Sequence, residues 1–133
     1  MALASAVAVL PSACSSDDPP SPVGAWQMQV QTTLPSSGTA KITFHNDGTV
    51  LQEGSNTLPG TGFWQISRDN KVTFQVTIPL ADSTKENIIG TIRGQQTADF
   101  KKDKVTATGT SELYDLKGNK TKSFQVTLTG APA

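Results

Sequence analysis

The sequence predicts an all-β domain that closes into an eight-stranded antiparallel up-and-down barrel. From Val23 onward, apolar and polar residues alternate with a period of two, the spacing of strands with one buried face. Turn residues separate eight such runs, and no segment repeats apolar residues at helical spacing over three turns. Eight strands joined by sequential hairpins suffice to close a barrel and pair both edges. A two-sheet sandwich is the alternative, but it needs crossing connections longer than any loop here.

The first four runs cover residues 25–33, 40–44 and 49–53 and the segment around Trp64 and Ile66. The first two each place their apolar residues on one face, and the second ends at Asp47-Gly48. Asp-Gly is a strong signal for a tight hairpin, because both central turn positions need positive φ. The third run is short and its facing is ambiguous, which leaves the direction of Glu53 open.

The last four runs cover residues 72–80, 87–100, 105–113 and 124–128. The fifth alternates without a break from Val72 to Leu80. The sixth contains Gly90 and Gly94 on its apolar side, and glycines inside a strand indicate sharp curvature or a bulge. These runs complete the predicted barrel.

The length, net charge and composition of the chain exclude several classes of function. The chain has 133 residues, enough for one globular domain, and its 11 basic and 11 acidic side chains cancel. A neutral chain lacks the field that concentrates polyanions, so we expect no nucleic-acid partner. With one histidine and one cysteine the sequence has no zinc cluster and no Ser-His or Cys-His dyad, and we expect no metal and no cofactor.

The first 14 residues, MALASAVAVLPSAC, form an apolar run that closes on small residues and a cysteine, and a polar, proline-rich stretch follows. This segment resembles the end of a bacterial lipoprotein signal, which implies lipidation at Cys14. An ordinary cleaved signal or a disordered tail is the alternative. We therefore expect residues 1–22 to be a leader and linker, residues 23–133 to be the single barrel domain, and the protein to be exported. Its contact with a membrane would be through the lipid anchor only.

The first strand opens with Gly24-Ala25-Trp26. This tripeptide resembles the Gly-x-Trp signature of the lipocalin and calycin group, and avidins have a similar opening. The resemblance implies a lipocalin-like barrel with an internal ligand cavity.

The connections differ in length between the two ends of the predicted barrel. Successive turns of an up-and-down barrel fall at alternate ends. The connections 45–48, 68–70 and 100–104 at one end are short and polar, whereas 34–38, 54–60, 81–87 and 115–120 at the other are longer. Leu34 and Leu58 lie in the longer connections, where we expect a ligand portal.

Inward positions of the later strands define a predicted pocket. Its apolar wall is formed by Trp64, Phe74, Ile92 and Phe124. Small residues at inward positions of the sixth and seventh runs form the other wall: Gly90, Gly94, Ala98, Ala107 and Gly109. Gln96 and Ser111 are expected to face inward and to orient a polar group of the ligand. The alternative is that the aromatic rings fill the barrel completely.

Three functions remain open at this point. The first is a binding module for a small apolar or amphipathic ligand. The second is a small-barrel isomerase or cyclase that resembles allene oxide cyclase, with Glu53, Gln96 and Ser111 converging in the cavity. The third is a protein-interaction domain with a filled core that uses Leu34 and Leu58 as a contact surface. The oligomeric state is not readable from the sequence.

Overall fold

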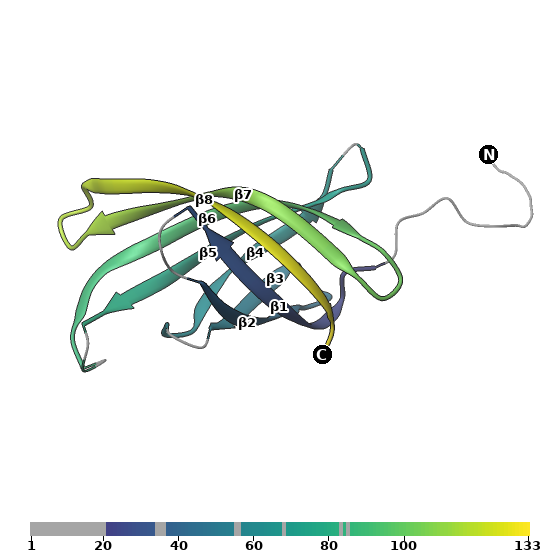
Figure 1. The fold of residues 1–133 in the computed structure, drawn as a ribbon, viewed down its shortest axis with the longest axis horizontal. Helices are drawn as coiled ribbons and strands as arrows, with labels where there is room; N and C mark the ends of the chain where they lie inside the picture. The colour runs from purple at the N-terminus through teal and green to yellow at the C-terminus, as the bar shows by residue number, and fades with distance from the viewer. Residues whose placement is uncertain (1–20, 34–36, 55–56, 68, 83, 85) are drawn as a thin grey trace, which may run out of the picture.

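The chain folds into one closed antiparallel barrel of eight strands (Figure 1). A computed structural model describes residues 21–33, 37–54, 57–67, 69–82, 84 and 86–133. Each strand pairs with the next, and β8 closes the barrel against β1, so the predicted fold class is confirmed. The strands are β1 (Gly24–Thr32), β2 (Ser37–Phe44), β3 (Thr49–Gly54), β4 (Gly60–Ile66), β5 (Val72–Ala81), β6 (Ile88–Phe100), β7 (Val105–Asp115) and β8 (Lys120–Pro132). No helix in this part of the chain is long and apolar enough to cross a membrane.

Strict alternation along the strands creates a single apolar interior. In β5, the side chains of Val72, Phe74, Val76 and Ile78 are buried, and the intervening residues face outward or lie partly exposed. The same period of two places Trp26 and Met28 of β1 inside the barrel. The inward rows of the eight strands therefore meet in one core, which is the main source of stability for such a domain.

Aromatic side chains fill one end of this interior. The ring of Phe44 lies edge-on to the rings of Phe74 and Phe100, with centroids 5.2 and 5.4 Å apart. Trp26 packs edge-on against Phe100 at 4.9 Å, and its Nε1 donates a hydrogen bond to the carbonyl of Pro22 at 2.9 Å. Edge-to-face pairs add to the stabilisation from burial. We call this the packed end.

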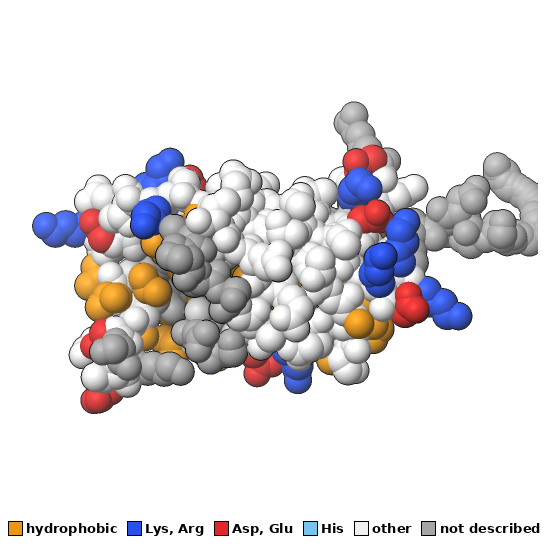
Figure 2. Space-filling model, viewed as in Figure 1, with side chains coloured by type: hydrophobic (Ala, Val, Ile, Leu, Met, Phe, Trp, Pro, Cys, Tyr) orange, Lys and Arg blue, Asp and Glu red, His pale blue; other side chains and the backbone are white. Residues whose placement is uncertain are grey.

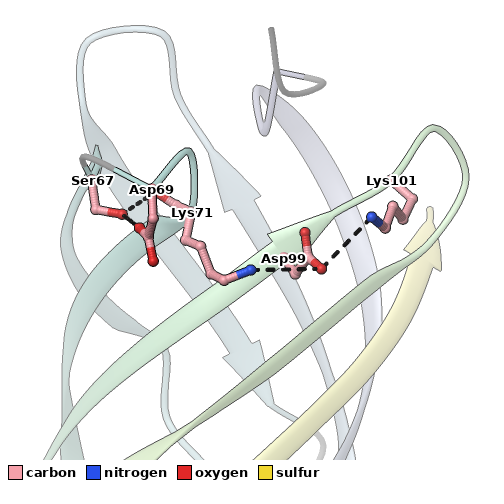
Figure 3. Close-up of polar contacts among 5 residues, drawn as sticks. All are labelled: Ser67, Asp69, Lys71, Asp99 and Lys101. Carbon is pink, nitrogen blue, oxygen red and sulfur yellow. Dashed lines mark hydrogen bonds and ion pairs between the residues drawn. The ribbon is translucent and has the colours of Figure 1, made fainter. Parts of the chain in front are cut away.

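Short polar turns cover the packed end. Near the β4–β5 turn, the hydroxyl of Ser67 hydrogen-bonds to the Asp69 carboxylate (Figure 3). The Asp99 carboxylate lies 3.8 Å from the ammonium groups of both Lys71 and Lys101, which connects this turn to the β6–β7 turn. These groups are partly exposed, so solvent screens the ion pairs and each contributes little to stability.

The sequence predicted curvature or a bulge in β6, and the structure has an irregularity of pairing near the start of this strand. Near the other end of the barrel, the pairing of β5 with β6 shifts register after Leu80, and that of β7 with β8 shifts after Leu113. Gly90 lies so close to β7 that a Cβ atom at this position would be 2.2 Å from the carbonyl oxygen of Tyr114. Glycine is needed there because the two backbones approach closely.

Candidate functional site

The other end of the barrel contains a cavity of about 210 Å³. We call this the open end. Every strand except β4 contributes to the wall, which consists of Val30, Thr32, Gly38, Thr39, Ala40, Gln52, Gly54, Thr57, Phe74, Val76, Ile78, Ile92, Gly94, Gln96, Ser111, Phe124, Val126 and Leu128. The lining is mainly apolar, with a few polar groups, which is the usual composition of a small-molecule site.

The inner row of β6 shows where the cavity stops. Ile92, Gly94 and Gln96 line it, whereas the next inward residues, Ala98 and Phe100, belong to the packed end. Phe74 pairs with Gln96 across the β5–β6 ladder and also lines the cavity. Gln96 and Phe74 therefore form the floor of the cavity, and the cavity opens toward the end that carries the β1–β2, β3–β4, β5–β6 and β7–β8 connections.

Five of the predicted site residues come together around the cavity: Phe74, Ile92, Gln96, Ser111 and Phe124. They lie on four consecutive strands, β5 to β8. Strand alternation alone was enough to place them, because each lies on the buried face of a long strand with an unbroken period of two.

Two other predicted residues lie elsewhere. Trp64 is not part of the cavity lining. Its Nε1 donates a hydrogen bond to the carbonyl of His45 at 2.8 Å and its ring packs against Phe44, which places it at the packed end. Leu58 is half-buried in the connection after β3, where its neighbour Thr57 contacts the cavity instead. Leu34 and Cys14 lie outside the described residues.

The small residues of β6 and β7 serve a different purpose from the one predicted. Of this set only Gly94 lines the cavity. Ala98 and Ala107 are buried in the packed end. A Cβ atom at Gly109 would lie 1.9 Å from the carbonyl oxygen of Gln95, so the absence of a side chain there permits close approach of two strands.

The sequence left the orientation of β3 open, and the pairing register settles it. Gln52 pairs with the fully buried Ile42, and directly paired residues share a face of the sheet. Gln52 therefore points inward and lines the cavity, while Glu53 is exposed. Both faces of this short strand contain polar residues, so the sequence pattern does not predict which face points inward.

Two polar side chains are buried in the wall. Gln96 is 5% exposed and Ser111 is 6% exposed. The Oε1 atom of Gln96 is buried and has no hydrogen-bond partner among the described residues. Buried polar atoms are nearly always paired, so an orphan such as this one needs an explanation.

Apolar side chains are exposed at the rim of the open end. Ile88 and Ile89 at the start of β6 and Leu116 in the β7–β8 turn are between 44% and 70% exposed. Figure 2 shows apolar side chains gathered at the end of the molecule that carries the β7–β8 hairpin. The rim gives an apolar molecule a surface to contact outside the cavity.

Two carboxylates near the open end, those of Asp82 and Glu112, lie outside the cavity. The Asp82 carboxylate accepts hydrogen bonds from the backbone and hydroxyl of Thr84 and from the Asn87 side chain. The Thr84 hydroxyl, followed by the Asn87 amide, lowers the pKa of Asp82 to about 2. The hydroxyl of Tyr114 and the ammonium group of Lys120 likewise lower the pKa of Glu112. Both carboxylates are charged at neutral pH. Asp82 stabilises the β5–β6 turn, and Glu112 binds side chains of β7 and β8.

No known family model, curated protein or solved structure matches this chain. The closed antiparallel barrel of eight strands is consistent with a lipocalin-like fold. The described residues contain no group of three or more His, Cys, Asp or Glu side chains that could hold a metal ion.

Proposed function

We propose that this protein is an exported binding module that holds a small, mostly apolar molecule in the open end of its barrel. The observation that carries the proposal is the cavity of about 210 Å³, with its apolar wall and its two buried polar side chains. A packed barrel of this size has no space left for a ligand.

The volume of the cavity limits the size of the ligand. An engineered apolar cavity of about 150 Å³ in another protein binds benzene. A cavity of about 210 Å³ has room for a ring with a few additional heavy atoms. The ligand class is therefore a small cyclic or short branched molecule, and a longer molecule would extend over the apolar rim.

The lining favours binding over catalysis. Among the residues that the structure describes, none in the lining has an ionisable side chain. Glu53, the predicted candidate for proton transfer, is exposed on the outside of the barrel. General acid–base catalysis requires such a group within hydrogen-bond reach of the substrate, so the isomerase or cyclase alternative lacks its chemical group. The cavity also counts against the interaction domain, which was expected to have a filled core.

The point where the chain enters the barrel determines how an N-terminal anchor would orient the cavity. The described chain begins at the packed end, where Pro22 accepts the hydrogen bond of Trp26. The cavity opens at the opposite end. A lipid anchor on Cys14 would therefore direct the cavity mouth away from the membrane.

Titration of the barrel with 4-ethyltoluene, followed by calorimetry, tests the proposal. We expect saturable binding with one site per chain. Gly94→Val adds a branched side chain to a residue that lines the cavity, next to the Ser111 hydroxyl, and should weaken binding at least tenfold. Thr97→Val on the outer face of the same strand is the matched control and should bind normally. Absence of saturable binding, or equal binding by Gly94→Val with its fold retained, would contradict the proposal.

A further inference from the structure

We infer that the ligand is a neutral molecule that carries a hydroxyl or primary amide group, and that this group pairs with Gln96 and Ser111 at the floor of the cavity. The inference rests on the proposed function and names the chemical class of the ligand. It starts from the orphaned Oε1 atom of Gln96.

The surroundings of Gln96 explain why the protein itself does not pair this atom. Oε1 lies 2.7 Å from the position that a Cβ atom would take at Gly109, and Nε2 lies 3.9 Å from the corresponding position at Gly94. The side-chain amide therefore lies along two glycines, neither of which has a side chain to offer. The two glycines leave room for the amide of Gln96. Folding alone does not require an amide at position 96, since an apolar side chain at this position would avoid the cost of an unpaired buried acceptor.

Ser111 provides the second polar group at the same place. It pairs with Gly94 across the β6–β7 ladder, and its hydroxyl is 3.0 Å from the Cβ position of that glycine. The hydroxyl of Ser111 and the amide of Gln96 thus flank Gly94 on the inner wall. Rotation of the amide exchanges its oxygen and nitrogen. A ligand group that both donates and accepts hydrogen bonds is matched in either orientation, and hydroxyl and primary amide groups have this property.

The floor of the cavity has no positively charged partner for an anionic group of a ligand. Every lining residue in the described part of the chain is uncharged. Arg93, on the same strand, points outward and stacks over the ring of Tyr114, with its guanidinium carbon 4.5 Å from the ring centroid. A carboxylate at the floor would lose its hydration without gaining a counter-ion, which is strongly unfavourable.

The placement of these groups also fixes the direction of the ligand. The polar pair lies deep in the cavity, and the rim at Ile88, Ile89 and Leu116 is apolar. The polar group enters first, and the apolar part of the ligand faces the mouth.

Three probes of similar size test the inference by calorimetry on the full chain. These are 4-ethyltoluene, 4-ethylphenol, in which a hydroxyl replaces the methyl group, and 4-methylbenzoate, which carries a charge. We expect 4-ethylphenol to bind roughly tenfold tighter than 4-ethyltoluene, because its hydroxyl pairs a buried group that is otherwise unpaired. We expect 4-methylbenzoate to bind more weakly than both.

Two variants test whether Gln96 and Ser111 cause the preference for 4-ethylphenol over 4-ethyltoluene. Gln96→Met keeps the length of the side chain and removes its amide, and should bring the affinities for 4-ethylphenol and 4-ethyltoluene within about twofold of each other. Ser111→Ala removes the second group and should reduce the preference severalfold. Gln95→Met, on the outer face next to Gln96, is the control and should retain the full preference.

The outcomes separate this inference from the proposed function. If 4-ethyltoluene binds but 4-ethylphenol binds no tighter, or if 4-methylbenzoate binds best, the assignment of a neutral hydrogen-bonding ligand is wrong and the binding module remains. The assignment to these two residues is wrong if both floor variants keep the preference. If none of the three probes binds, the proposed function fails and the inference fails with it.

Discussion

The two ends of this barrel are built from the same strands and differ in what fills them. At the packed end, the rings of Trp26, Phe44, Phe74 and Phe100 meet edge-on, and each of these side chains is at most 5% exposed. At the open end, the same strands surround a cavity of about 210 Å³. Strand alternation sets the inward direction at both ends, so the size of the inward side chains decides which end is solid and which end is hollow.

Strand β6 shows this difference within one inward row. Toward the packed end it contributes Ala98 and Phe100, which are buried among aromatic side chains. Toward the open end it contributes Gly94 and Ile92, which border empty space. Gln96 lies between them, at the boundary of the two regions. The packed end thus supplies stability, and the open end supplies a site.

Removal of an aromatic ring should cost most at the packed end. Phe44→Ala should lower the free energy of unfolding by about 3–5 kcal/mol, because the ring is fully buried and its neighbours cannot fill the space. Phe124→Ala at the cavity wall should cost only about 1–2 kcal/mol, because this side chain is partly exposed and already borders a void. Urea denaturation measures both. Equal losses would show that the two ends are packed alike.

Added side-chain volume should destabilise the fold more at a buried alanine of the packed end than at one that lines the cavity. Ala98→Leu at the packed end should destabilise the fold by about 1–3 kcal/mol, because close-packed neighbours must move. Ala40→Leu should cost less than about 1 kcal/mol, because the added carbons can enter the cavity. Both alanines are at most 2% exposed, so burial itself does not distinguish them. Thermal unfolding compares the two variants, and a larger loss for Ala40→Leu would contradict the proposed difference.

Replacement of the orphaned amide should stabilise the ligand-free protein. Gln96→Met should raise the free energy of unfolding by about 1 kcal/mol, since it removes a buried acceptor that has no partner. Ser123→Ala, at an exposed position on β8, is a control for which we expect no change within about 0.5 kcal/mol. A clear loss of stability in Gln96→Met would mean that the amide is paired in the folded protein.

The smallest expected effect concerns the turn between β5 and β6 at the open end. The pKa of Asp82 is lowered from 3.8 to about 2 by hydrogen bonds from Thr84 and Asn87. The stabilisation from a lowered pKa is present above pH 3.8 and is lost as the pH falls through about 2. The amide resonance of Thr84 should therefore shift with a midpoint near pH 2, and Asp82→Asn should abolish this transition. A midpoint near pH 4 would indicate that the hydrogen bonds are absent in solution.

The sequence was sufficient to predict the barrel because its alternation is regular. All eight strands form where the sequence predicts them. Five cavity residues were predicted for the same reason. The predicted difference in connection length is wrong: connections of four to six residues join the strands at the open end, and connections of four or five residues join them at the packed end, because several strands extend beyond their predicted bounds. Trp64 was misplaced because the hydrogen bond to His45 that positions its ring joins segments 19 residues apart. Gln52 was missed because only the register with Ile42 reveals its direction.

The roles of the glycines were not predictable from alternation. The sequence shows that Gly90, Gly94 and Gly109 lie on one face, but it does not distinguish empty space from close approach of a neighbouring strand. That distinction depends on the coiling of β6 against β7. Of these three glycines, Gly94 alone borders the cavity, and a Cβ atom at either of the other two would collide with a carbonyl oxygen.

Methyl-resolved NMR under xenon pressure tests the difference between the two ends most directly, since xenon enters apolar cavities large enough to hold it. We predict saturable shifts at the methyl groups of Ile92, Ile78 and Leu128, which line the cavity. The methyl groups of Val72 and Val105, both at most 1% exposed in the packed end, should not respond. Equal responses at both ends, or no response at the cavity methyl groups, would contradict a hollow open end.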